Sequence, residues 1–271
     1  MKRYLAFILA IMMLVCCLAS CGGDTNTDGT TTSATVEQGV KISRSFLAGY
    51  EKTVAMGENE MQMSGRVLMN LMSDGTLDIY VGFIGMGSHQ TAHYTGTYTL
   101  GENAEFDETI SFSYTYAEGA VEEVKDAVII GGKFETPFYM ITSMTSTSLN
   151  FYETAPVDVD GDVYVGYMTK TGGMGAMVYS YALTMKGEGK FNVSIMQLAS
   201  VMHVWGSTDG TYVVDGEKVT FTYNVVDDVG EVVKENHVSE GTEYTATGLK
   251  VGFNIAQASV QASPATFIKV K

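Results

Sequence analysis

The dominant pattern from about residue 45 onwards is the alternation of apolar and polar side chains. Alternation with a period of two residues is typical of β-strands that bury one face. The clearest examples are residues 77–83, 110–114 and 219–223. Asp-Gly pairs at 74–75, 209–210 and 215–216 provide turn signals at hairpin spacing. The pattern therefore predicts an all-β chain of antiparallel strands.

One segment departs from this alternation. Between Gln38 and about Met56, apolar residues recur at mixed spacing: Val40, Phe46, Leu47 and Tyr50. This spacing predicts a short helix at the start of the folded part.

The folded part also contains an internal repeat with an offset of 114 residues. The offset carries Gly75 onto Gly189, residues 77–81 onto 191–195, His89 onto His203, and the Gly-Thr-Tyr at 96–98 onto 210–212. Past this motif the second copy is five residues shorter, so that residues 110–114 meet 219–223. Alternation alone would not reproduce the glycine, the histidine and the Gly-Thr-Tyr in phase, and we therefore infer a duplication.

Each copy resembles small bacterial lipocalin-like domains. The resemblance rests on the order of segments 73–77, 96–98 and 109–112 in the first copy and on residues 207–221 in the second. The Gly-x-Trp of animal lipocalins is absent, and the single tryptophan, Trp205, lies in the middle of its copy. The resemblance implies an antiparallel up-and-down β-barrel, which closes its edges and can enclose one small ligand.

The duplication allows two architectures. The copies form either two small barrels in tandem or one barrel or sandwich with pseudo-two-fold symmetry. Pro156, one of only three prolines, lies in the connector at 153–158 and favours a boundary there. We therefore prefer two units, one over residues 45–155 and one over 156–271.

The N-terminus carries an export signal. Lys2 and Arg3 precede an apolar stretch at 4–18, which is shorter than the roughly 20 residues of a membrane-spanning helix. The stretch ends in Leu-Ala-Ser-Cys at 18–21, which resembles the lipobox of bacterial lipoproteins. This resemblance implies a signal peptide over residues 1–20 and a lipid on Cys21; a plain signal peptide or an uncleaved anchor is the alternative. Residues 21–44 would then hold the lipidated cysteine and a flexible Gly/Thr/Ser tether.

Cysteine content and charge limit the partners. Cys16, Cys17 and Cys21 are the only cysteines, so the exported domain has no disulfide framework. The formal net charge is −15, from 16 Lys and Arg against 31 Asp and Glu. Without a surplus of cations, nucleic-acid binding is not expected. We expect an exported protein attached to a bacterial membrane, at the cell surface or on the periplasmic side, by its N-terminal lipid alone.

Several residues are of types that bind metal ions in proteins. His89 and His203 are repeat-equivalent, but neither they nor His93 have clustered ligands at metal-site spacing, so ordinary hydrogen-bonding roles are expected. The acidic run at 158–162 has alternating carboxylates but lacks the remaining positions of a calcium loop, and we interpret it as a turn. Methionines are plentiful, and three roles suit them: packing in an apolar core, lining an adaptable apolar cavity, or binding Cu(I) through their thioether sulfurs. Those considered are Met61, Met63, Met69, Met72, Met168, Met174 and Met177.

No catalytic arrangement is recognisable. Ser88 lies in a Gly-Met-Gly-Ser-His segment that lacks the closing glycine of a nucleophile elbow. The Gly-rich segment 172–175 lies between predicted strands, and we expect the acidic pairs at 122–123 and 227–228 to lie in polar loops. We therefore expect neither a catalytic residue nor a metal or cofactor, and no enzyme.

Two functions fit these features. The first is a non-catalytic, lipid-anchored envelope protein that holds a small apolar or amphipathic ligand inside a barrel. Its candidate lining, which a packed core would equally require, consists of Met69, Leu71, Leu77, Ile79, Met185, Phe191 and Val193. The alternative is a structural or interaction module that contacts envelope proteins or glycans and has no internal ligand. A cavity of roughly 300 Å³ or more would favour the first function, and a filled interior the second.

Overall fold

The computed structural model describes residues 39–56, 59–85, 87–105, 107–116, 119–139, 146–172, 175–199, 202–227, 231–254 and 264–271. Over these residues the regular structure consists of sixteen strands and one 3₁₀ turn, η2 (Gly187–Gly189), which confirms the all-β prediction. The first sheet contains β1 (Ile42–Met56), β2 (Asn59–Met72), β3 (Thr76–Gly85), β4 (Ser88–Glu102), β5 (Glu108–Tyr116), β6 (Ala120–Ile129), β7 (Lys133–Phe138) and β8 (Thr147–Thr154). The second contains β9 (Asp162–Gly172), β10 (Gly175–Lys186), β11 (Lys190–Ala199), β12 (Met202–Asp215), β13 (Lys218–Val226), β14 (Val232–Gly241), β15 (Gly248–Val251) and β16 (Ala265–Lys269).

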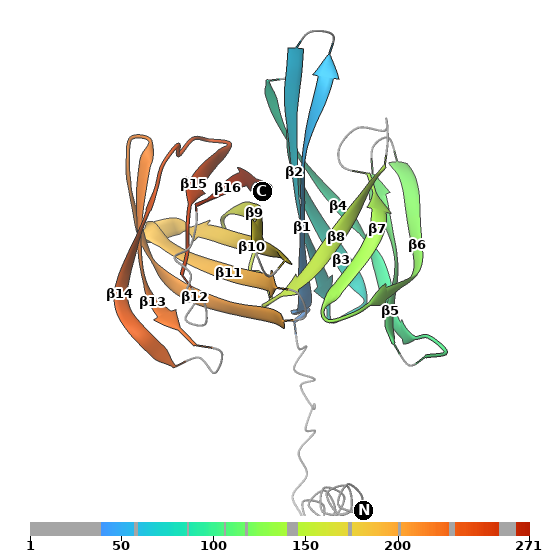
Figure 1. Ribbon diagram of the computed structural model, residues 1–271. Helices are drawn as coiled ribbons and strands as arrows, with labels where there is room; N and C mark the ends of the chain where they lie inside the picture. Colours follow the sequence, from blue (N-terminus) through green and yellow to red (C-terminus); the bar gives the residue numbers. More distant parts are fainter. Residues whose placement is uncertain are drawn as a thin grey trace, which may run out of the picture. The chain divides into compact units, whose positions relative to one another are not determined.

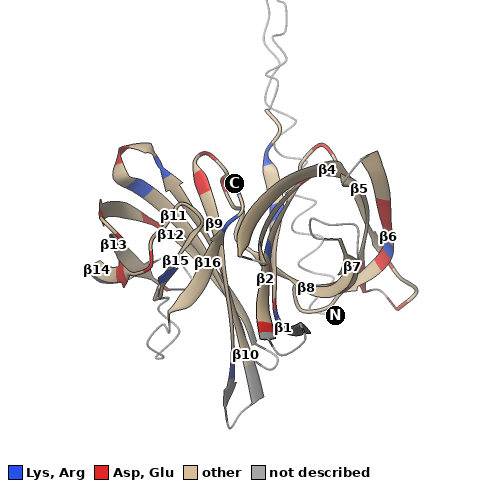
Figure 2. Ribbon diagram, turned by 90° about the horizontal axis from the view of Figure 1, so that it is seen from above, with Lys and Arg blue, Asp and Glu red and all other residues tan. Residues whose placement is uncertain are grey.

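Each sheet is an antiparallel meander whose first strand also pairs with its last. The strand order is β6-β5-β4-β3-β2-β1-β8-β7 in the first sheet, and the second repeats it from β14 to β15 (Figure 1). A meander that returns to its own first strand forms a barrel. Figure 2 looks into the first sheet, whose strands form a ring. The structure thus contains two barrel-like sheets in tandem, here called the first barrel (β1–β8) and the second barrel (β9–β16).

The helix predicted from Gln38 to about Met56 is wrong. Residues Ile42–Met56 form strand β1, and Gln38 lies outside the described residues. Phe46 faces the core of the first barrel, while Leu47 belongs to a second apolar cluster on the opposite side of the strand. Because β1 is buried on both faces over residues 45–48, its sequence does not show the alternation by which a half-buried strand is recognised.

The duplication is visible in equivalent hydrogen bonds. Strands β3 and β11 are displaced by 114 residues, as the repeat predicts. The Tyr98 hydroxyl donates to the carbonyl oxygen of Met72 at 2.8 Å, and the Tyr212 hydroxyl donates to that of Lys186 at 3.1 Å. Both partners of the second bond lie 114 residues after those of the first.

A charge pair between the first and last strands also repeats, with its signs exchanged. In the first barrel Arg44 on β1 binds Glu153 on β8, with 2.7 Å between Nε and Oε1. By strand register, Asp162 on β9 takes the place of Arg44, and Lys269 on β16 takes the place of Glu153. The Lys269 Nζ lies 2.7 Å from the Asp162 Oδ1.

Each barrel has its own core of inward-facing side chains. On β5 the buried residues Ile110, Phe112 and Tyr114 alternate with partly exposed serines, which is the predicted pattern. The equivalent residues of β13 are buried in the second core: Val219, Phe221 and Tyr223.

The two barrels meet through a third apolar cluster. It includes Leu47 and Leu68 of the first barrel and Val165 and Ala182 of the second, all with 0% exposure. Residues 40–271 accordingly form one compact unit. Area removed from water in this cluster stabilises the contact between the barrels.

A buried polar triad connects this cluster to the connector between β8 and β9. The Ser45 hydroxyl donates to the Asn70 Oδ1 at 2.7 Å, and the Asn70 Nδ2 donates to the carbonyl oxygen of Val157 at 3.0 Å. The Val157 N–H in turn donates to the Ser45 Oγ at 2.9 Å. Each of these buried groups is therefore hydrogen-bonded, as burial requires.

The contacts between the barrels are reciprocal. The His89 Nε2 lies 2.9 Å from the carbonyl oxygen of Lys269, and the His203 Nε2 lies 2.9 Å from that of Glu153. The two histidines are repeat-equivalent, and so are Lys269 and Glu153 by register. Each barrel therefore offers the other the same pair of positions, as in the interface of a two-fold dimer.

Gly49 and Tyr167 occupy equivalent positions in β1 and β9 and face each other across this junction. A Cβ atom added to Gly49 would lie 2.6 Å from the Tyr167 Cγ. The Tyr167 ring also lies under the Arg66 guanidinium, with 5.5 Å between Cζ and the ring centroid. The close approach of the barrels therefore requires the absence of a side chain at residue 49.

We expect Gly49→Ala to lower the free energy of unfolding by about 1–3 kcal/mol, the usual cost of overpacking. Gly206→Ala is the matched control, because a Cβ there meets no atom within 4 Å; it should change stability by no more than about 0.5 kcal/mol. Urea unfolding of both variants and the parent chain measures the difference. Equal stability of the two variants would contradict the proposed close contact.

Candidate functional site

The positions predicted to line a ligand cavity are core residues. Met69, Leu71, Leu77, Ile79, Phe191 and Val193 are at most 2% exposed, and Met185 is 5% exposed. Aromatic rings pack among them: the centroids of Phe134 and Phe151 are 4.9 Å apart, and those of Phe191 and Phe221 are 5.0 Å apart. The described interior thus has the dense side-chain contacts of a packed core.

An ionic cluster spans one end of the first barrel. Arg44 binds Glu153 through Nε and Nη2, both at 2.7 Å, and Glu108 through Nη1 at 2.5 Å. Glu108 lies on β5, which is four strands from β1 in a ring of eight, so Arg44 reaches across the barrel. Burial lowers the pKa of Arg44, but its hydrogen bonds to the two carboxylates outweigh burial and raise the pKa overall.

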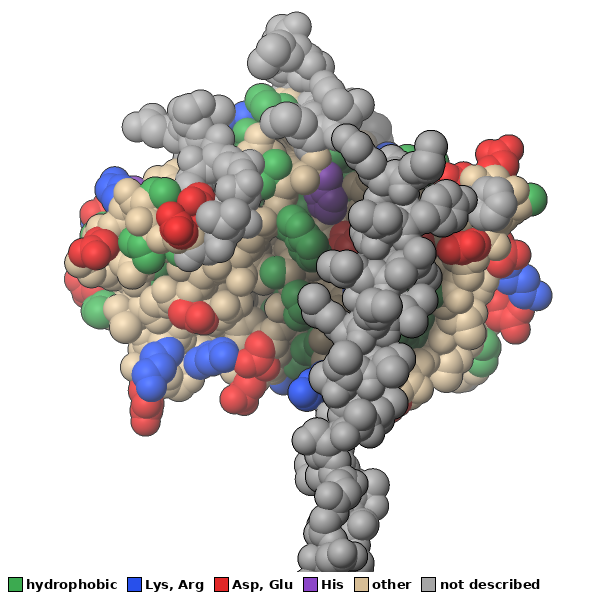
Figure 3. Space-filling view, turned by 90° about the horizontal axis from the view of Figure 1, so that it is seen from below, with side chains coloured by type: hydrophobic (Ala, Val, Ile, Leu, Met, Phe, Trp, Pro, Cys, Tyr) green, Lys and Arg blue, Asp and Glu red, His purple; other side chains and the backbone are tan. Residues whose placement is uncertain are grey.

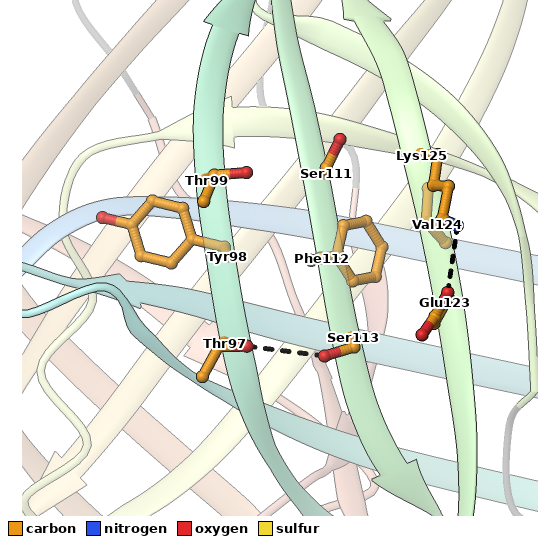
Figure 4. Close-up of a pocket in the computed structure, with 9 residues that line it drawn as sticks. All are labelled: Thr97, Tyr98, Thr99, Ser111, Phe112, Ser113, Glu123, Val124 and Lys125. Carbon is orange, nitrogen blue, oxygen red and sulfur yellow. Dashed lines mark hydrogen bonds and ion pairs between the residues drawn. The ribbon is translucent and has the colours of Figure 1, made fainter.

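A hollow of about 320 Å³ lies along β4, β5 and β6 (Figure 4). Its polar lining comes from alternate positions of each strand. Phe112 and the inner neighbours Tyr98 and Val124 belong to the core or pack against it. We call this hollow the outer trough; its outward side chains are Thr97, Thr99, Ser111, Ser113, Glu123 and Lys125.

The outer trough presents hydroxyls beside one exposed ion pair. The Thr97 Oγ1 lies 3.4 Å from the Ser113 Oγ, and the Lys125 Nζ lies 3.3 Å from the Glu123 Oε2. The side chains of Lys125 and Glu123 are 76% and 62% exposed. Donors and acceptors therefore face solvent together along the trough.

The same face of the second barrel has different chemistry. Register places Thr211 and Thr222 where the first barrel has Thr97 and Ser113. However, Val213 is 69% exposed in the position of Thr99, and Val238 is 51% exposed opposite Thr222. The fully polar form of this face thus belongs to the first barrel.

A second hollow of about 280 Å³ lies between the β1–β2 hairpin and β16. We call it the junction pocket, and its lining residues are Glu51, Lys52, Thr53, Gln62, Met63, Ser64 and Thr266. Arg66 is buried behind Glu51, to which its Nη2 donates at 2.7 Å. Burial lowers the pKa of Arg66, and the Glu51 carboxylate opposes this effect.

The histidines considered as metal ligands are engaged in other contacts. His89 and His203 each approach a backbone carbonyl of the opposite barrel, as described above. His93 lies 2.8 Å from the Asp78 Oδ1 and stacks on Tyr80 with centroids 4.5 Å apart. Among the described residues, no group of three or more His, Cys, Asp or Glu side chains is arranged to hold a metal ion.

The acidic run at 158–162 forms a turn. The Lys186 Nζ lies 2.7 Å from the Asp158 Oδ2, and this bond holds the pKa of Asp158 below its usual value. The Asp160 N–H donates to the Asp158 Oδ1 at 3.0 Å, and the Lys269 Nζ pairs with Asp162. On the face shown in Figure 3, acidic and basic side chains are likewise interspersed.

Other candidates are divided between the core and the turns. Met168 and Met177 pack against the second core, and Met63 lines the junction pocket. The Ser88 hydroxyl donates to the carbonyl oxygen of Gly85 at 3.0 Å within a hairpin turn. The expectation that the acidic pair at 122–123 lies in a loop is wrong, because both residues belong to strand β6. Met174 and Asp228 lie outside the described residues.

Cys21, the predicted lipid attachment site, also lies outside the described residues. Within the part of the chain that the structure describes, no helix has the length and apolar content needed to cross a membrane. Attachment through Cys21 therefore stays a prediction.

Comparison with known proteins assigns no family. The chain matches no protein-family model, no curated protein and no solved structure. Function is therefore inferred from the geometry and chemistry of the chain itself.

Neither hollow was identified from the sequence. The outward hydroxyls of the trough are visible as the alternation in residues 97–99 and 111–113, but alternation alone does not separate a binding face from a solvated one. Arg66 directly precedes a run of buried residues on β2, and a charge beside such a run is the sequence signal that could have indicated the junction.

Buried tyrosines give the cores a pH dependence. Burial raises the pKa of Tyr94 to about 12, with a smaller contribution from Tyr116. The Tyr94 ring packs 5.8 Å from that of Tyr114, whose pKa burial also raises. In both cases the apolar surroundings disfavour the charged phenolate.

We expect the free energy of unfolding to fall as the pH rises from about 10 to about 12. Tyr94 stays neutral in the folded chain while it ionises in the unfolded chain, so its contribution is complete below pH 10 and is lost above it. One such group contributes a slope of at most about 1.4 kcal/mol per pH unit. Urea unfolding of the parent chain and of Tyr94→Phe across this range should give a shallower slope in the variant. Identical slopes would contradict the assignment.

Proposed function

We propose that this chain is a non-catalytic, lipid-anchored protein of a bacterial envelope that binds a glycan in the outer trough. The observation that carries the proposal is the hydroxyl-lined trough of about 320 Å³ on the outside of a barrel whose predicted cavity-lining residues are buried in its core. Binding on the outer face needs no internal cavity.

The chemistry of the trough favours a glycan over a protein partner. Cores of protein interfaces are rich in aromatic and other apolar side chains. The outward residues of the trough are four hydroxyls, one carboxylate and one ammonium group. Sugar hydroxyls both donate and accept hydrogen bonds, so they can satisfy such a lining without leaving apolar surface uncovered.

The N-terminal sequence supports the location. The basic start, the apolar stretch and the lipobox-like Leu-Ala-Ser-Cys at 18–21 occur in the order that lipid attachment requires. The polar segment at 22–38 would separate the barrels from the membrane. An acidic domain on such a tether is not drawn onto anionic headgroups and keeps its outer faces accessible.

The other function that the sequence suggests is a carrier that holds a small apolar or amphipathic ligand inside a barrel. It is less well supported, because the residues that would line its cavity are buried against one another. Binding of a glycan in the outer trough is therefore the better supported function.

We expect the double variant Thr97→Val/Thr99→Val to bind its glycan at least tenfold more weakly than the parent chain. Valine keeps the shape of threonine and removes two hydroxyls, each of which contributes about 1 kcal/mol when hydrogen-bonded. Isothermal titration of the full mature chain with maltohexaose, cellohexaose and chitohexaose measures the change.

Thr211→Val is the control for this experiment, because Thr211 holds the position of Thr97 in the second barrel. Its affinity should equal that of the parent chain. Failure of all three oligosaccharides to bind, or an equal loss in the control, would count against the trough as a glycan site.

We expect Cys21→Ser to abolish acylation, since serine cannot carry the thioether-linked lipid. The variant should then be found either in the soluble fraction or as a precursor that keeps residues 1–20. Cys17→Ser should leave the membrane fraction unchanged, because residue 17 belongs to the removed segment. Mass analysis of the parent should find acyl chains on Cys21 and no residues 1–20. An intact, unacylated precursor in the membrane would refute the anchor.

A further inference from the structure

The junction pocket lies beside the point where the two barrels stop being alike. Arg66 on β2 and Ser180 on β10 are repeat-equivalent, and both are 0% exposed. Burial of an unneutralised arginine is costly. Since the second barrel uses a small serine at the same place, the fold itself does not require a cation there.

Arg66 fixes the position of one carboxylate. Its Nη1 donates to the carbonyl oxygens of Tyr50 and Gly65, at 3.1 Å and 2.9 Å, and its Nη2 donates to the Glu51 Oε1 at 2.7 Å. The Glu51 side chain remains 59% exposed and lines the junction pocket. Glu51 thus presents an oriented, solvent-accessible carboxylate, held from behind by a guanidinium that has no other acidic partner among the described residues.

Both barrels contribute to the pocket. Strand alternation places Glu51, Thr53, Gln62 and Ser64 on the side of the β1–β2 hairpin that bears Arg66, and β16 of the second barrel adds Thr266. These side chains combine a carboxylate and an amide with three hydroxyls. Pockets at the interface of two domains are a frequent location of small-molecule sites.

We propose that the junction pocket binds one small neutral polyol, of the size of a monosaccharide, with Glu51 as the oriented acceptor of its hydroxyl protons. Adjacent hydroxyls of a sugar ring can donate to a single carboxylate, and Gln62 both donates and accepts. The volume of about 280 Å³ lies just below the roughly 300 Å³ at which drug-sized sites begin, which suits a ligand as small as a monosaccharide. The site is separate from the outer trough, which lies wholly on β4–β6.

Because Thr266 belongs to the second barrel and the other lining residues belong to the first, occupation of the pocket bridges the two. A ligand that binds only the folded chain raises its stability in proportion to the logarithm of its concentration. Polyol binding should therefore raise the Tm of the full chain, and the increase should be absent when the pocket is altered.

The experiment uses the full mature chain with three probes: myo-inositol, D-glucose and N-acetyl-D-glucosamine. Saturation-transfer NMR should detect binding of at least one probe, with a dissociation constant that Gln62→Ala and Glu51→Gln each raise at least tenfold. Glu51→Gln also removes the carboxylate partner of Arg66, whereas Gln62→Ala leaves that pair intact. Glu240→Gln, an exposed carboxylate on β14, is the matched control and should leave the dissociation constant unchanged.

Three results would overturn the proposal. The first is the absence of binding by all three probes to the parent chain at millimolar concentration. The second is binding that Gln62→Ala leaves unchanged, and the third concerns the outer trough. If Thr97→Val/Thr99→Val abolishes the binding instead, the ligand lies in the outer trough, which refutes the junction pocket and supports the proposed function.

Discussion

The contact between the two barrels is the constraint on which the other features depend. Strands β1 and β2 of the first barrel and β9 and β10 of the second each bury one face in their own core and contribute residues to the shared cluster. Their sequences are therefore limited on both sides. Strands β4–β6 and β12–β14 are buried on one side only, so their outward residues can change without loss of the fold. Binding chemistry is accordingly expected on those outer faces or at the rim of the contact.

The two halves have diverged in both places. On the outer faces, Thr99 of the first barrel corresponds to the exposed Val213 of the second. At the contact, the first barrel has the pair Gly49 and Arg66 where the second has Tyr167 and Ser180. In the first barrel the small Gly49 lies beside the large Arg66, whereas in the second barrel the large Tyr167 lies beside the small Ser180. This complementarity lets the halves approach closely while only one of them carries a buried charge.

The periodic features of the chain could be predicted from sequence, and the features that depend on contacts between its halves could not. Alternation at 110–114 and the 114-residue offset predicted the strands and the duplication, because these depend on local geometry. The offset left one barrel and two barrels both open, and Pro156 in the connector favoured two. The helix predicted from Gln38 to about Met56 is wrong, since β1 is buried on both faces over residues 45–48 and a strand loses its alternation there. His89 and His203 were correctly expected to make ordinary hydrogen bonds, but their acceptors lie 180 and 50 residues away. The pocket beside Glu51 and Arg66 exists only because the second barrel contributes Thr266 and Tyr167 there, and no local sequence pattern describes such a contact.

The exchanged charge pair bears on how a chain whose two halves share one strand order closes each barrel with the correct final strand. Tandem repeats are prone to misassembly, because the last strand of either copy can approach the first strand of the other. Here such an error would bring Lys269 against Arg44 and Glu153 against Asp162, which sets like charges together in both barrels. Correct closure sets opposite charges together in both. The inversion therefore discriminates between right and wrong strand pairings by repulsion as well as attraction, so that the charges disfavour closure of a barrel with the strand of the other copy.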